Sequence, residues 1–143
     1  MLFYSCMQII KIKKGEFMTK LDLFSKEETT KILVELGMSA NLQGFKYMQD
    51  SVARVVKEPR LIKKVTKVLY PEIGKEYDVS GSVVERSMRH ATDMAYFKTG
   101  FKTLHKMFGL DNEIMGYKPT NCELIAIISE ALRFKAQRQG LLA

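Results

Sequence analysis

The chain has no tryptophan, three prolines, two histidines and two cysteines among its 143 residues. Cys6 and Cys122 lie far apart and form neither a CxxC nor a Cys/His spacing. The sequence therefore predicts neither a disulfide framework nor a zinc site, and a reduced, cytoplasmic protein is the simpler interpretation. No apolar run approaches the ~20 residues that cross a bilayer, so no membrane partner is expected.

Signatures of catalysis are also missing. The chain contains no GxGxxG, GxxxxGK[ST] or GxSxG string. Asp93 follows His90 by three residues, but with no nucleophile nearby the two are better interpreted as a helix-surface pair than as a catalytic dyad. We therefore expect no enzyme activity, no cofactor and no metal.

The residues that are present describe one soluble globular domain. Hydrophobic residues make up 46% and charged residues 27% of the chain, and the formal net charge is +7. Residues 1–17 carry +2, residues 60–106 carry +5, and the rest of the chain is neutral. A basic zone between neutral ones favours a polyanionic partner, although a solvated basic face explains a modest surplus equally simply.

The first residues are a separate question. Lys13-Lys14-Gly15-Glu16 is what a purine-rich ribosome-binding site would encode if translated, and Met18 follows it directly. We therefore predict Met18 as the true start, with 1–17 a non-native leader or disordered arm and 18–143 the helical domain. The alternative is an ordinary short N-terminal strand or arm.

Helical spacing recurs along the chain and strand-like alternation does not, which predicts an all-α fold with no sheet. Gly37, Gly100 and Gly109 are expected to end helices. A further helix is expected through Leu61 to Leu69, with three lysines on its outer side. Four helix starts are predicted from N-cap residues, three of them with a carboxylate three positions on: Ser25 with Glu28, Asn41, Ser82 with Glu85, and Thr120 with Glu123.

Residues 71 to 98 fit a helix-turn-helix. Pro71 suits the first turn of a short helix that runs to about Tyr77, and a tight connection leads to a longer helix that begins near Ser80 or Ser82. Gly74 supplies the small residue where the two helices touch. The predicted inner positions are Ile73, Tyr77, Val79, Val84, Met88, Ala91 and Ala95. The same pattern occurs in helical hairpins that bind no nucleic acid.

The outer face of the second helix favours DNA. Arg86 and Arg89 lie one turn apart, and arginine reads guanine through a bidentate contact to O6 and N7. Glu85 could accept from a cytosine amino group or orient an arginine; the plain alternative is a solvated face with an i,i+4 ion pair. We predict base contacts from Ser82, Val83, Glu85, Arg86, Arg89 and His90, and phosphate contacts from Lys64, Lys67, Lys75 and Lys98.

Several strings in the chain match a known family. They are Gly44-Phe45-Lys46-Tyr47, Thr66-Lys67-Val68-Leu69-Tyr70-Pro71, Val84-Glu85-Arg86, Met88-Arg89-His90-Ala91 and Lys118-Pro119-Thr120-Asn121. Over roughly residues 29 to 136 the chain resembles the C-terminal effector domain of the stage-zero sporulation transcription factor A of endospore-forming bacteria. The resemblance implies a six-helix bundle of the response-regulator effector (winged-helix-like) type. It also implies binding to double-stranded DNA as tandem dimers, with the recognition helix at about 81–98 in the major groove.

The resemblance assigns roles to particular residues. The predicted base-contacting residues fall on the family's recognition helix, but Val83 stands where the family usually has an arginine that reads a base. That substitution implies relaxed or altered operator choice, since a bidentate contact is worth about 1–3 kcal/mol of discrimination. His105 and Phe108 fall on the surface that touches the polymerase sigma subunit, and His105 replaces a small hydroxyl residue.

Control of activity is where the resemblance is weakest. The family normally carries an N-terminal receiver domain, and residues 1–28 are too short for one. We therefore expect a stand-alone effector or a shortened paralogue. Two hypotheses remain: a sequence-specific transcriptional regulator, or a protein-interaction module that acts as a decoy or modulator of the full-length regulator or of RNA polymerase.

Overall fold

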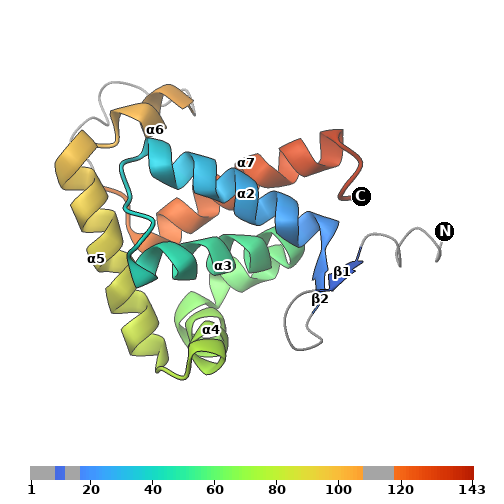
Figure 1. Cartoon of the computed structure of the whole chain (residues 1–143), viewed down its shortest axis with the longest axis horizontal. Helices are drawn as coiled ribbons and strands as arrows, with labels where there is room; N and C mark the ends of the chain where they lie inside the picture. Colours follow the sequence, from blue (N-terminus) through green and yellow to red (C-terminus); the bar gives the residue numbers. More distant parts are fainter. Residues whose placement is uncertain (1–8, 12–16, 108–117) are drawn as a thin grey trace.

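The computed structural model describes residues 9–11, 17–107 and 118–143 (Figure 1). In the described residues, six α-helices follow a short β-hairpin, which confirms the all-α bundle. The elements are β1 (Ile9–Lys11), β2 (Phe17–Thr19), α2 (Lys20–Glu35), α3 (Gln43–Lys57), η2 (Pro59–Lys63), η3 (Val65–Leu69), α4 (Tyr70–Tyr77), α5 (Gly81–Thr99), α6 (Lys102–Met107) and α7 (Asn121–Arg138).

Helix α3 is the centre of the bundle. Ten of its fifteen residues are buried, and it contacts α2, α4, α5 and α7. In Figure 1, α5 packs across the N-terminal end of α3, and α4 lies beside the start of α5. The position of α5, which carries the predicted DNA contacts, is therefore set mainly by α3.

Helix α2 begins earlier than its sequence pattern predicts. Thr19 caps it in a reciprocal box, in which the Asp22 N–H donates to Thr19 Oγ1 at 3.0 Å and the Thr19 N–H donates to Asp22 Oδ2 at 3.2 Å. Ser25, the predicted cap, is fully buried inside the helix, so that prediction was wrong. The longer helix lets Leu21 and Phe24 pack against the core, a gain that a start at Ser25 would forgo.

Two other predicted caps were also wrong. Leu42 is the N-cap of α3 and makes no side-chain cap bond, whereas Asn41 accepts a hydrogen bond from the Ser39 hydroxyl instead. The capping box predicted at Ser82 does not form, whereas the other predicted start, near Ser80, is confirmed: Ser80 is the extended residue after the turn, and its Oγ accepts from the Val83 N–H at 3.3 Å. The capping box at Thr120 is confirmed, as are the helix ends near Gly37 and Gly100. Gly109 lies outside the described residues.

The segment before α4 is not the regular α-helix that its sequence pattern predicts. A 3₁₀ helix, η2, gives way to a π-helical turn, η3, in which the Leu69 N–H donates to the Lys64 carbonyl at 3.1 Å. Pro71 explains the wide turn, because in a regular helix its ring would clash with the carbonyl of Lys67. The faces are nevertheless as expected: Leu61, Val65 and Leu69 are buried, while Lys63, Lys64 and Lys67 are exposed.

A two-stranded antiparallel sheet precedes the bundle, although the sequence pattern predicts none. Strand β1 pairs with β2, with Ile10 opposite Met18. The hairpin lies beside the start of α2 (Figure 1). The start at Met18 and the division at residue 17 stay predictions. Among the described helices, none has the length and apolar character needed to cross a membrane.

Candidate nucleic-acid interface

The turn between α4 and α5 locks the two helices together. After Tyr77 the chain turns through Asp78 in the left-handed conformation, at φ 56° and ψ 45°, and the Val79 N–H donates to the Gly74 carbonyl at 2.9 Å. A Cβ on Gly74 would lie 2.4 Å from the Val79 oxygen, so only glycine fits there. The small residue and tight connection predicted for a helix-turn-helix are confirmed.

Polar contacts fasten α4 to α3. The Tyr77 hydroxyl donates to Asp50 Oδ2 at 2.5 Å, and Arg54 pairs with Glu72 at 3.3 Å and also with Glu76. Burial and the Asp50 carboxylate together raise the pKa of Tyr77 well above its usual range. The partners lie 18 to 27 residues apart in the sequence, and no local pattern in the sequence indicates them.

The inner side of α5 packs tightly on α3. A Cβ on Gly44 would lie 2.2 Å from the Ser87 carbonyl oxygen and 2.9 Å from the Ala91 Cβ, so the two backbones approach at their closest there. The predicted inner stripe of α5 is confirmed, since all four side chains are completely buried: Val84, Met88, Ala91 and Ala95. With this face fixed, the opposite face of α5 must point to solvent.

The outer face of α5 carries the predicted base-contacting residues. Ser82, Arg86 and His90 are exposed, and Val83 is half-buried. Arg89 Nη1 donates to Glu85 Oε1 at 2.8 Å, one turn apart along the helix. This contact is the i,i+4 ion pair that the plain alternative of a solvated face predicts, and it also agrees with the interpretation in which Glu85 orients an arginine.

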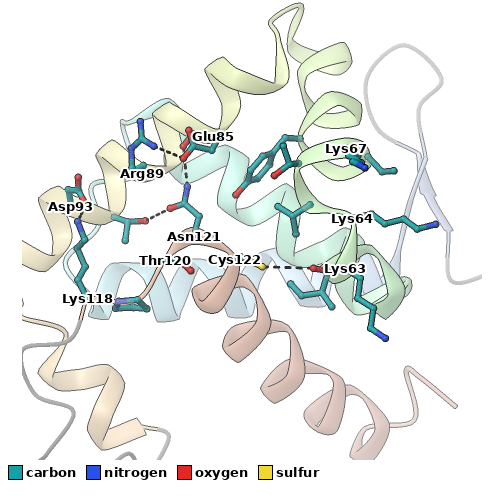
Figure 2. Close-up of a pocket in the computed structure, with 17 residues that line it drawn as sticks. Lys63, Lys64, Lys67, Glu85, Arg89, Asp93, Lys118, Thr120, Asn121 and Cys122 are labelled. Carbon is teal, nitrogen blue, oxygen red and sulfur yellow. Dashed lines mark hydrogen bonds and ion pairs between the residues drawn. The ribbon is translucent and has the colours of Figure 1, made fainter.

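The four lysines predicted to contact phosphate are all exposed, but they do not lie together. Lys64 and Lys67 belong to the irregular segment and flank α5 on the side of Arg89 (Figure 2). Lys98 lies nine residues after Arg89, about 180° around the helix axis. Its Cβ would be 3.7 Å from a Cβ on Gly37, so Lys98 belongs to the other flank of α5. Lys75 lies on α4.

A cavity of about 1080 Å³ opens beside Arg89, between the irregular segment, α5 and the start of α7. Lys63, Lys64 and Lys67 line one side of it, and Glu85 with Arg89 another (Figure 2). The sequence pattern places three lysines on one face. It does not show that α7, some fifty residues later, closes the far side of that face.

Asn121, the first residue of α7, ties that helix to the recognition helix. Its Nδ2 donates to the Glu85 carbonyl at 3.1 Å, and its Oδ1 accepts from the Thr92 hydroxyl at 3.3 Å. Burial raises the pKa of Tyr70 to about 12, and the nearby Asn121 side chain opposes part of that rise. In the sequence, Asn121 stands out only as part of a string that matches the family. Its buried, hydrogen-bonded position is what identifies it as a structural link.

The structure does not form the predicted pair of His90 and Asp93. Asp93 pairs with Lys118 Nζ at 2.5 Å rather than with His90, so the helix-surface pair predicted from their spacing was wrong. The contact stabilises the start of the last helix, because Lys118 lies two residues before its N-cap. Within the described part of the chain, no group of His, Cys, Asp and Glu side chains is arranged to hold a metal ion.

The predicted polymerase-contacting surface stays untested. Phe108 lies outside the described residues, and so does the side chain of His105, although the backbone of His105 belongs to α6.

A scan against family models matches residues 29–132 to the C-terminal domain of the sporulation initiation factor Spo0A. The match spans more than half of the chain and includes α3, α4 and α5. The chain belongs to this family. The Spo0A C-terminal family consists of DNA-binding effector domains rather than a class of enzymes, and the resemblance predicted from sequence strings is confirmed.

Membership in the Spo0A C-terminal family shows a function at the family level, namely DNA binding in transcriptional regulation. The matched segment contains every residue of the cavity as well as the helix-turn-helix. The hairpin and the first turns of α2 lie outside the match.

Proposed function

We propose that the chain is a sequence-specific, non-enzymatic transcriptional regulator that inserts α5 into the major groove of double-stranded DNA. The observation that carries the proposal is the exposed face of α5, opposite a completely buried stripe, on a helix-turn-helix of the Spo0A C-terminal family. A helix fixed in this way presents a constant set of side chains to the groove.

Arg86 is the best-placed base reader. It is exposed and makes no ion pair or hydrogen bond with any described residue, so its guanidinium is free to reach a guanine. Arg89 is paired with Glu85, so it contacts DNA either after this ion pair breaks or with Glu85 still bound to it. Ser82 and His90 flank the two arginines as secondary contacts. Val83, where the family usually has arginine, offers only apolar contact.

The phosphate contacts divide between two flanks of α5. Lys64 and Lys67 are placed to reach one strand of the duplex, and Lys98 the other. Lys75, on the helix before the turn, is the fourth. Such contacts position the protein on the duplex without reading its sequence.

The wider assembly follows from the family resemblance. We propose tandem-site homodimers on DNA, a sigma-subunit contact through His105 and Phe108, and a cytoplasmic location on the nucleoid. A different candidate function, a protein-interaction module, is favoured by Phe97 and Met94 of α5, which are exposed by 87% and 49%. They lie three residues apart, on the solvent side of the same helix.

Fluorescence anisotropy of the purified chain tests the proposal. The partners are a duplex with the family's tandem operator boxes and a scrambled duplex, each at several salt concentrations. Preference for the operator by about 10³-fold or more is expected for a sequence reader. Equal, strongly salt-dependent binding would contradict sequence reading, and no binding to either duplex would favour the protein-interaction module.

Arg86→Ala sharpens this test. Loss of a guanine contact should cost about 1–3 kcal/mol on the operator and much less on the scrambled duplex. The matched control is Arg60→Ala, which removes an exposed arginine outside α5. Equal losses on both duplexes would show that Arg86 only contacts phosphate.

A further inference from the structure

Cationic side chains outnumber anionic ones in the lining of the cavity beside α5. Five cationic and two anionic side chains line it, and both anions are already paired, Glu85 with Arg89 and Asp93 with Lys118. We propose that this cavity is a binding site for the phosphate ester of a nucleotide, and that Arg89 couples its occupancy to DNA reading.

The cationic side of the site is available. Lys63, Lys64 and Lys67 are exposed, and their ammonium groups have no ion pair or hydrogen-bond partner among the described residues. They come from one short stretch of chain, and Figure 2 shows all three on the same side of the cavity. Three ammonium groups without carboxylate partners match the charge of a di- or triphosphate.

Apolar side chains form another part of the lining. Ile62, Val65, Val68 and Pro119 contribute to the walls together with the Tyr70 ring. An inorganic phosphate ion would leave this apolar surface uncovered, whereas the base and sugar of a nucleoside would pack against it. The cavity volume, about 1080 Å³, is slightly larger than the range of about 300–1,000 Å³ typical of small-molecule sites, so a nucleotide fits in it.

The cavity is also bounded by the start of α7. Thr120 and Asn121 line it, and the N-terminal end of an eighteen-residue helix carries partial positive charge. Because Asn121 is held by Glu85 and Thr92, this wall keeps a fixed position relative to α5. The cations and the helix end therefore border the same cavity.

Arg89 belongs both to this cavity and to the outer face of α5. A phosphate in the cavity competes with Glu85 for the Arg89 guanidinium and draws it away from the bases. The ligand that we infer is a free nucleotide. Contacts of Lys64 and Lys67 with backbone phosphates belong to the proposed function, and the experiment separates the two.

The test uses two variants of the full chain with equal loss of charge. The cavity variant carries Lys63→Ala, Lys64→Ala and Lys67→Ala; the control carries Lys20→Ala, Lys102→Ala and Lys106→Ala, three exposed lysines that do not line the cavity. Calorimetric titration with adenosine 5′-triphosphate and anisotropy with the operator duplex across salt concentrations are measured for both. Urea unfolding establishes that both variants fold.

Each outcome decides the proposal. A tenfold or larger loss of triphosphate affinity in the cavity variant alone identifies a free nucleotide as the ligand. If the native chain binds no triphosphate, the nucleotide site is overturned, and a fall of the DNA salt slope by about two to three units in the cavity variant alone shows that these lysines serve only the backbone contacts of the proposed function. Equal behaviour of the two variants in both assays overturns the proposal. If no chain binds the duplex, the proposed function fails and the triphosphate titration alone decides.

Discussion

Two sides of the same recognition helix are held by different kinds of contact. Toward α3, α5 buries an apolar stripe completely, and at Gly44 the two helices are too close to admit a Cβ. Toward α7, a cavity opens beside α5, and Asn121 at its wall joins the two helices by hydrogen bonds. Close packing fixes where α5 lies, whereas the open side leaves cations accessible next to the DNA-facing surface.

Gly44→Ala should break the packed side and have the largest effect. The added Cβ would lie 2.2 Å from the Ser87 oxygen and 2.8 Å from its carbonyl carbon, and backbone atoms cannot rotate away. We expect the free energy of unfolding in urea to fall by about 3 kcal/mol, the upper end for overpacking. Lys46→Ala, on an exposed position of the same helix, is the control and should change stability by less than about 0.5 kcal/mol. A Gly44→Ala variant as stable as the native chain would contradict the close approach of α3 and α5 at this position.

Asn121→Ala tests the open side and should have a smaller effect. It leaves the buried Thr92 hydroxyl without its partner, at a cost of about 1–2 kcal/mol in urea unfolding. Because the link to Glu85 is also lost, operator affinity should fall more than affinity for a scrambled duplex. Cys122→Ser, at the next and exposed residue, is the control. A loss of stability with an unchanged operator preference would show that Asn121 only supports the fold.

Glu85→Gln should leave the fold almost unchanged and alter DNA binding. A partly exposed ion pair contributes little, so stability should change by less than about 0.5 kcal/mol. Freed Arg89 should raise affinity for both duplexes by at least about threefold. Combining the change with Arg89→Ala should abolish the gain. A loss confined to the operator would instead show that Glu85 contacts a base.

The smallest effect concerns the Cys122 thiol, which lines the cavity. Burial, with a smaller contribution from Glu123, raises the pKa of Cys122. Because only the thiolate is nucleophilic, its alkylation by iodoacetamide should accelerate at a higher pH in the folded chain than in urea. Mass spectrometry of the peptide that contains Cys122 separates it from Cys6. Coincident pH profiles in the folded and unfolded chain would contradict the raised pKa.

The sequence predicts those parts of the fold that depend on neighbouring residues. Gly74, the turn at Asp78 and the stripe from Val84 to Ala95 are local patterns, and the structure confirms all three. Thr120 and Glu123 satisfy each other within one helical turn, so that box is also predictable. Each of these signals is complete within a few residues of chain.

The sequence-based predictions are wrong where contacts between residues far apart in the chain decide which of two nearby residues begins a helix. Thr19 and Ser25 both head capping boxes in the sequence, and the core contacts of Phe24 favour the earlier start. Ser80 and Ser82 compete in the same way, and the turn geometry selects Ser80. The cavity could not be predicted, because its far wall is α7.

The links around α5 also differ in how far apart their partners lie along the chain. Gly74 and Val79 meet across five residues, whereas Asn121 and Glu85 are separated by 36, and Lys135 and Glu28 by 107. Closing a short loop costs less conformational entropy than closing a long one. We therefore expect the helix-turn-helix to form early in folding. On this order of events, the cavity comes into existence only when the last helix docks.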